Sequence, residues 1–145
     1  MKMRANVKIT TEDVRTGVCT VDELHNTSCL AGMESLANRL IGANTGEVKY
    51  FAVGTGVTAP SEADTKLETE IERKQISVRG ALGTVAHFRV FFNTSEANGV
   101  LKEIGLFGDT ATITADSGVL FARALINKTK TSNETLTIDW SLSIE

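Results

Sequence analysis

The arrangement closest to a ligand-binding motif is a set of glycines that follows the apolar segment at residues 48–53. The sequence "YFAVGTGVTA" places Gly54, Gly56 and Ala59 in a G-x-G-x-x-A pattern, the outline of a dinucleotide-binding turn. In that motif a helix begins within the glycines. Here Pro60 indicates a later helix start, and no alternating strand–helix pattern follows. The sequence favours a plain glycine turn, and nucleotide binding through Gly54 and Gly56 is the alternative.

Two cysteines and a histidine lie close enough in the sequence to be considered as metal ligands. Cys19, His25 and Cys29 offer suitable atoms, but the only other histidine is His87. Zinc prefers four ligands that come in closely spaced pairs. We therefore expect two free thiols and no bound metal.

Catalysis would need an acid–base pair or an activated nucleophile, and the sequence offers neither in a recognisable setting. Glu68, Glu70 and Glu72 recur at every second residue, so on a helix they would spread around its surface. His25 and His87 are not accompanied by a nucleophile motif such as G-x-S-x-G. We predict no catalytic residue, no cofactor and no small-molecule substrate, and hence a protein that is not an enzyme.

The segment "LKEIGLFG" at residues 101–108 reads as a strand, yet it carries an ionisable pair. Strand alternation places Glu103 on one face with Leu101 and Gly105, whereas Lys102 lies on the other face. A carboxylate on a covered face must be paired or become protonated, because an isolated buried charge is very unfavourable. The alternative is that Glu103 faces water beside Lys102.

Two arginines are suitable partners for a buried Glu103. Arg73 ends a predicted helix, and Arg123 lies in the next predicted strand, where a cross-strand partner would fall. The planar guanidinium group suits a carboxylate better than a lysine ammonium does. Gly105, on the same face, would leave room for an arginine stem or a neighbouring backbone. We therefore predict a structural clasp, formed by Glu103, Arg73, Arg123 and Gly105, that ties a helix to a sheet.

Short helices are predicted only in the N-terminal half of the chain. The best covers residues 30–41, where apolar residues recur with helical period between a capping Ser28 and a C-terminal Gly42. Capping-box spacing allows a helical turn at residues 21–26. A second short helix is expected after Ser61, and it would continue through "ETEIER".

The remaining sequence has the alternation and turn signals of an antiparallel β protein. Apolar and polar residues alternate without interruption over residues 135–144, which predicts a well-covered strand. The other predicted strands cover residues 48–53, 85–92, 100–107 and 119–126. The predicted core residues are Leu136, Ile138, Trp140, Leu142 and, from an earlier alternating strand, Phe88.

Composition indicates a single globular domain. The chain has 145 residues, of which 41% are apolar and 23% charged, so it can bury a core without disulfides or metals. A net charge of −3 argues against nucleic acid, and the sequence has no signal peptide and no membrane span. Residues 1–10 could be an extended lead-in strand, with Lys2, Arg4 and Lys8 solvated; an arm that binds a charged partner is the alternative. The expected fold class is mainly β: an N-terminal arm and helix at residues 1–47, then an antiparallel β-sandwich at residues 48–145.

Five segments between Tyr50 and Glu145 occur in a recognisable order. They are a strand into a VG-x-G turn with a following proline, then L-x-x-E-x-x-R, then E-I-G-L-F, then a strand with a lysine-containing turn, and a last alternating strand. The pattern positions are Val53, Gly54, Gly56, Pro60, Leu67, Glu70, Arg73, Glu103, Ile104, Gly105, Leu106, Phe107 and Lys128. In order and spacing these segments resemble the N-terminal domain of bacteriophage tail-collar fibre proteins and related small phage tail proteins.

The resemblance implies a virion structural part, the domain by which a fibre attaches to the baseplate or tail, usually as a trimer. Unlike a collar fibre, this sequence has no shaft after its last strand. We therefore expect a virion protein, assembled in the host cytoplasm, that docks as a homo-oligomer on other virion proteins as a tail or baseplate adaptor. A trimer is the expected oligomer, and a capsid decoration protein is the alternative role. No nucleic acid or membrane partner is expected.

Overall fold

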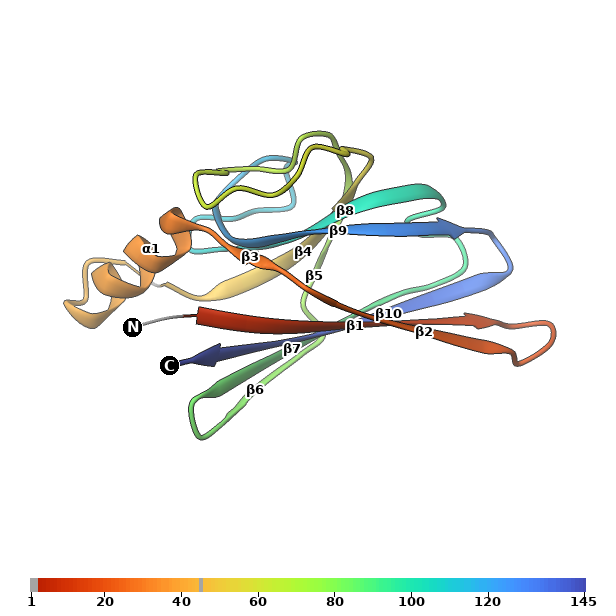
Figure 1. The fold of residues 1–145 in the computed structure, drawn as a ribbon, viewed down its shortest axis with the longest axis horizontal. Coiled ribbons are helices and arrows are strands. Elements are labelled where there is room, and N and C mark those ends of the chain that lie inside the picture. The colour runs from red at the N-terminus through yellow and green to blue at the C-terminus, as the bar shows by residue number, and fades with distance from the viewer. Residues whose placement is uncertain (1–2, 45) are drawn as a thin grey trace.

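The computed structural model describes residues 3–44 and 46–145, which form two antiparallel five-stranded sheets stacked as two layers (Figure 1). Sheet A has the strand order β2-β1-β10-β7-β6, and sheet B has the order β3-β9-β8-β4-β5. The strands of sheet A are β1 (Met3–Asp13), β2 (Cys19–His25), β6 (Val78–Leu82), β7 (Val85–Phe92) and β10 (Glu134–Ile144). The strands of sheet B are β3 (Thr27–Ser28), β4 (Val48–Gly54), β5 (Glu70–Gln75), β8 (Gly99–Gly108) and β9 (Val119–Lys130). The predicted mainly β class is confirmed.

The described residues contain one helix, α1 (Leu30–Leu40), at the position predicted from helical periodicity. Its N-terminal boundary residue is Cys29 rather than Ser28, because the Ser28 hydroxyl donates instead to the Met3 carbonyl at 3.1 Å. Gly42 follows the helix with φ of +74°, a conformation that favours glycine. The predicted C-terminal glycine is therefore confirmed.

The two other helix predictions are wrong, because strand pairing outweighs the local capping signals. Residues 21–26 fall largely within β2, which pairs with β1. The segment after Ser61 is a loop, and "ETEIER" forms most of β5, an edge strand paired with β4. The charged side chains that suggested an exposed helix are also typical of a sheet edge, where they discourage unwanted strand pairing.

The N-terminal segment is an interior strand of the sandwich rather than an arm. β1 pairs with β10 on one side and with β2 on the other. Arg4 and Lys8 are exposed on its outer face, and Lys2 lies outside the described residues. Its inward-facing residues are buried, namely Met3, Ala5, Val7 and Ile9. The expected division at residue 47 is therefore wrong, since residues on both sides of it build the same sandwich.

The main core lies between the two sheets and is centred on β10. This strand lies between β1 and β7, and its residues Leu136, Ile138 and Trp140 are 0% exposed. The Trp140 ring packs against the Phe51 ring of sheet B, with centroids 5.9 Å apart. Leu142 is also buried, and Phe88 is half-buried against the same cluster. The predicted core is confirmed.

Candidate functional site

Glu103 of β8 is completely buried on the face of sheet B that is turned away from the main core. Its carboxylate accepts hydrogen bonds from the main chain of the loop at residues 55–69. The Oε1 atom binds the N–H groups of Gly56 at 2.9 Å and Thr69 at 2.7 Å, and Oε2 binds the N–H group of Glu68 at 3.0 Å. These donors replace the water that a buried carboxylate loses.

Arg123 of β9 supplies the positive charge beside Glu103, and its side chain is 2% exposed. Its Nε donates to Glu103 Oε2 at 2.9 Å, and its Nη2 lies 2.8 Å from the same oxygen, an ion-pair contact without an aligned hydrogen bond. Its Nη1 donates to Asp64 at 3.0 Å. Burial opposes the charge, yet hydrogen bonds to Glu103 and Asp64 raise the pKa of Arg123 above its usual value. The predicted pairing of Glu103 with Arg123 is confirmed.

The glycines of the G-x-G pattern are sites of close approach to the same carboxylate. A Cβ atom at Gly56 would lie 2.5 Å from Glu103 Oε1, and one at Gly54 would lie 2.6 Å from it. Residues 55–69, all of them described, contain no helix, so no helix N-terminus points at a phosphate site here. The glycines cradle a carboxylate of the protein itself, and the nucleotide-binding alternative gains no support from this geometry.

Gly105 makes room for leucine side chains and not for an arginine stem or a backbone. A Cβ atom there would lie 2.8 Å from Cδ2 of Leu67 and 3.1 Å from Cδ1 of Leu120. Leu67 is fully buried and anchors the loop at residues 55–69 against sheet B. The predicted need for a small residue is confirmed, but the predicted occupant is wrong because the loop inserts its own apolar side chain.

A β-bulge in β9 lies opposite the β8 segment just before Glu103. The register with β9 shifts between Leu101 and Glu103, and Leu101 joins Ile104 in the main core. The prediction that Leu101 and Glu103 share a face is therefore wrong. Between these residues β8 advances by two positions while β9 runs from Lys128 to Leu125, so β9 holds one extra residue and the pairing beside Leu101 is distorted. Lys102 donates to Asn127 at 2.6 Å. The alternative that Glu103 faces water is also wrong, since Glu103 is 0% exposed.

Arg73 forms a second buried clasp with different partners. It lies on β5, and its Nε and Nη2 donate to the two carboxylate oxygens of Glu70 at 2.7 Å each. Its Nη1 donates to the carbonyls of Thr112 and Ser117 at 3.0 Å each. The prediction that Arg73 contributes to the Glu103 clasp is therefore wrong. Because residue 73 belongs to a strand and not to a helix, it reaches the loop that follows β8.

Lys130 is a third buried cation, and it is not among the residues predicted from the sequence. Its side chain reaches the loop that follows β7, where Nζ donates to the Asn93 carbonyl at 2.9 Å and to Asn98 Oδ1 at 2.8 Å. Burial lowers the pKa of this lysine. The one available signal is strand parity, because Lys130 follows Ile126 at an even spacing on the inward face of β9.

The residues considered as metal ligands lie in different surroundings. Cys19 is exposed at the start of β2, His25 ends the same strand, and Cys29 is buried just before α1. Burial raises the pKa of the Cys29 thiol to about 12. Within residues 3–44 and 46–145, no three His, Cys, Asp or Glu side chains gather as a metal site.

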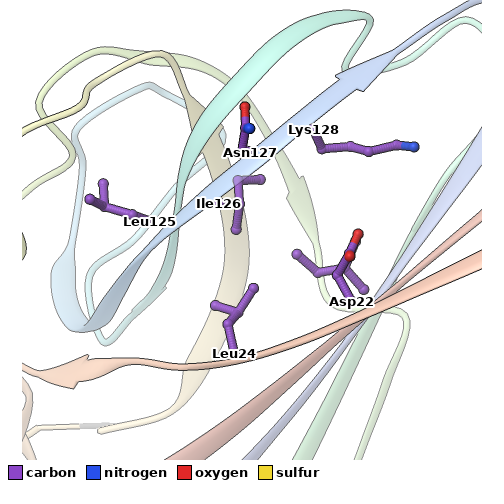
Figure 2. Close-up of a pocket in the computed structure, with 7 residues that line it drawn as sticks. Asp22, Leu24, Leu125, Ile126, Asn127 and Lys128 are labelled. Atoms are coloured by element: carbon purple, nitrogen blue, oxygen red, sulfur yellow. The ribbon is translucent and has the colours of Figure 1, made fainter.

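One open side of the sandwich contains a hollow of about 380 Å³ between β2 and β9 (Figure 2). Leu24 of β2 and Ile126 of β9 point toward one another across it. The polar residues at the hollow are Asp22, Asn127 and Lys128. Three large apolar side chains are exposed on the edge strands β2 and β6 of sheet A: Val21 is 53%, Val78 is 59% and Leu82 is 79% exposed.

No protein-family model, no curated protein and no solved structure matches this chain. In the part of the chain that the structure describes, no helix has the length and apolar character needed to cross a membrane. The fold and the site define a mainly β protein in which buried charged side chains hold surface loops against a sheet.

Proposed function

We propose that this chain is a bacteriophage virion structural protein that docks as a homo-oligomer on other virion proteins, as a tail or baseplate adaptor. The observation that carries this proposal is the convergence of the segments that resemble tail-collar attachment domains. Gly54, Gly56 and Glu103, which come from two of those segments, meet at one clasp. Leu67, from a third segment, packs over Gly105 beside them. The segments on which the resemblance rests therefore act together, since they hold the loop at residues 55–69 in place.

The buried charges support a structural role because they are used to position loops. Glu103 binds main-chain N–H groups of the loop at residues 55–69, and Arg73 binds carbonyls of the loop after β8. Lys130 binds a carbonyl of the loop after β7. Bonds to main-chain atoms fix the path of a loop directly. A loop with a fixed path suits docking, because it loses less conformational freedom when a partner binds.

Exposed apolar side chains at protruding positions also support docking. Leu40 and Ile41 at the C-terminal end of α1 are 84% and 79% exposed, and Leu82 at the end of β6 is 79% exposed. Figure 1 shows that α1 and the turn after β6 extend beyond the stacked sheets. Single exposed apolar residues are ordinary, but an uncovered edge strand that carries them offers both backbone and apolar contacts to a partner.

The test is to purify particles from the phage or lysogen whose genome encodes the chain and to identify their proteins by mass spectrometry. We expect the chain to remain with particles through density-gradient purification and to be labelled at the tail by gold-coupled antibodies. Absence from purified particles would contradict a virion role. Labelling over the head would contradict the tail assignment and favour a capsid decoration protein.

A further inference from the structure

The two edge strands of sheet A, β2 and β6, are uncovered and run in the same sense along the sheet. Every neighbouring pair in the order β2-β1-β10-β7-β6 is antiparallel, so the direction reverses at each step and is restored at β6. All residues of β6 are exposed, and those of β2 are exposed except the half-buried Leu24. Free strand edges present N–H and C=O groups that another strand can bind.

The two edges carry opposite charges. β2 contains Asp22 and Glu23 and has no lysine or arginine, whereas β6 contains Arg79 and has no acidic residue. Pairing two copies of β2, or two copies of β6, would bring like charges together, which destabilises a strand pair. Pairing β2 of one copy with β6 of another brings opposite charges together. The charge pattern therefore favours contact between different edges.

The opposite charges also lie on the same face of the sheet. Asp22 is paired in register with the buried Ile9, and Arg79 is paired with Phe88, so both point toward the sandwich side. Arg79 forms an ion pair with Glu47 of its own chain, yet its side chain remains 54% exposed. A guanidinium group has several N–H donors, so Arg79 can bind a second carboxylate.

One register makes the two edges complementary along the whole of β6. Setting Arg79 opposite Asp22 places Val78 opposite Val21 on the outer face. The remaining positions would be Gly80 opposite Glu23, Ala81 opposite Leu24, and Leu82 opposite His25. The strand that arrives at β2 would also lie beside the hollow in Figure 2, which Asp22 and Leu24 line from the same strand. Its inward side chains, Arg79 and Ala81, would then help to close that hollow.

We propose that β6 of one copy pairs in parallel with β2 of the next copy and so extends sheet A from copy to copy. This inference rests on the homo-oligomer of the proposed function and names its interface. Parallel pairing is favoured because β2 and β6 run in the same sense along sheet A, and a rotation well short of half a turn about an axis near the strand direction preserves that sense. Since the contact joins two different patches, it closes into a ring, such as a trimer, or continues as a filament.

Disulfide trapping of the purified chain tests the register. The triple variant Cys19→Ser, Val21→Cys, Val78→Cys places one thiol on each edge and removes the native exposed thiol, while the buried Cys29 stays in place. Head-to-tail pairing predicts covalent dimers and trimers under mild oxidation; the ladder ends at the trimer in a ring of three and continues to larger species in a filament. Each copy then contributes two different edges, so the ladder continues past the dimer.

Three control variants separate this interface from others. Two of the controls combine Cys19→Ser with a single new cysteine, either Val21→Cys or Val78→Cys. Each carries one edge thiol and should give no covalent dimer. Dimers from either control would instead indicate like-edge pairing and overturn the inference. In the third control Leu82→Cys replaces Val78→Cys. This moves the thiol ~13 Å along the strand at ~3.3 Å per residue, so the ladder should weaken at least several-fold. An equally strong ladder would overturn the register.

A charge exchange gives a second readout that does not depend on cysteines. Arg79→Glu and Asp22→Arg should each lower the fraction of oligomer several-fold in native mass spectrometry, and the double variant should restore it. If no trapping variant yields a ladder, the edge pairing is wrong even when the chain is found in particles. If the ladder forms but the chain is absent from particles, the proposed function is wrong and the edge pairing stands.

Discussion

Arg123 Nε donates to Glu103 Oε2 at 2.9 Å, and the two side chains are 2% and 0% exposed. This bond joins β9 to β8, while the same carboxylate accepts hydrogen bonds from the loop at residues 55–69. One buried ion pair therefore connects two strands and a surface loop. Loss of one partner would leave the other charged and out of reach of water.

We predict that Glu103→Ala lowers the free energy of unfolding by ~3–5 kcal/mol, because it leaves Arg123 buried without its main partner. Denaturant unfolding followed by circular dichroism measures the loss. Glu62→Ala in the same loop is the matched control, since Glu62 is exposed, and it should stay within ~0.5 kcal/mol of the parent. Replacing Arg123 as well, with methionine, should recover part of the loss. A Glu103→Ala protein as stable as the parent would show that the clasp does not stabilise the fold.

Gly56→Ala should be destabilising by ~1–3 kcal/mol, because the added methyl group must displace the carboxylate or the loop. The new Cβ atom would lie 2.5 Å from Glu103 Oε1 and 2.4 Å from Cβ of Glu68. Gly80→Ala is the comparison, because no atom lies within 4 Å of the Cβ position there. Thermal unfolding at low protein concentration compares the two variants. Equal melting temperatures for both would mean that Gly56 is not a site of close approach.

The two thiols should differ strongly in reactivity. Cys19 is exposed, whereas burial raises the pKa of Cys29 to about 12, so near pH 8 Cys29 carries almost no thiolate. Alkylation followed by mass spectrometry should give one fast adduct on the native chain and two on the unfolded chain. Cys29 Sγ lies 4.0 Å from the carbonyl of Ser61, which belongs to the loop at residues 55–69. Because Glu103→Ala loosens this loop, it should speed the labelling of Cys29. Rapid labelling of both thiols in the parent would contradict this packing.

The sequence predicts the β architecture well where alternation is strict. The segment around Trp140 alternates without a break and is the centre of sheet A. The predicted partner Arg123 binds Glu103 from the adjacent strand, diagonally, since in register Arg123 pairs with Gly105. A partner in the next strand follows from local rules, because antiparallel neighbours fix which side chains face each other. The placement of Arg73 in the Glu103 clasp is wrong, because its segment has capping signals for a helix but is held as a strand by β4, a contact that no local rule contains.

Two further features depend on tertiary contacts that the sequence does not display. The partner strand β9 holds an extra residue opposite the segment from Leu101 to Glu103, and Leu101 belongs to the main core although plain alternation places it on the face of Glu103. The basic residues Arg4 and Lys8 suggested an arm, yet they alternate with buried apolar residues of β1. The expected lead-in strand is confirmed as β1 and its basic residues are exposed, but its place between β10 and β2 depends on pairing that no local pattern shows.

Trp140→Ala should lower the free energy of unfolding by ~3–5 kcal/mol, because Trp140 is fully buried and packs against Phe51. Phe91→Ala removes another aromatic ring from a neighbouring strand, but Phe91 is 43% exposed, so the expected loss is below ~1 kcal/mol. The parent should show the blue-shifted fluorescence of a buried indole. Exposed-type emission together with a small loss at Trp140 would overturn the assignment of β10 as the core strand.

The most direct test of the central claim is symmetry-resolved density of the virion particle. The proposed function predicts several copies of this chain in mutual contact, with a ring of three expected, seated on other tail or baseplate proteins. The proposed interface predicts that β6 of each copy runs beside β2 of its neighbour. Density that shows only isolated single copies would contradict assembly as a homo-oligomer, which is the core of the proposed function.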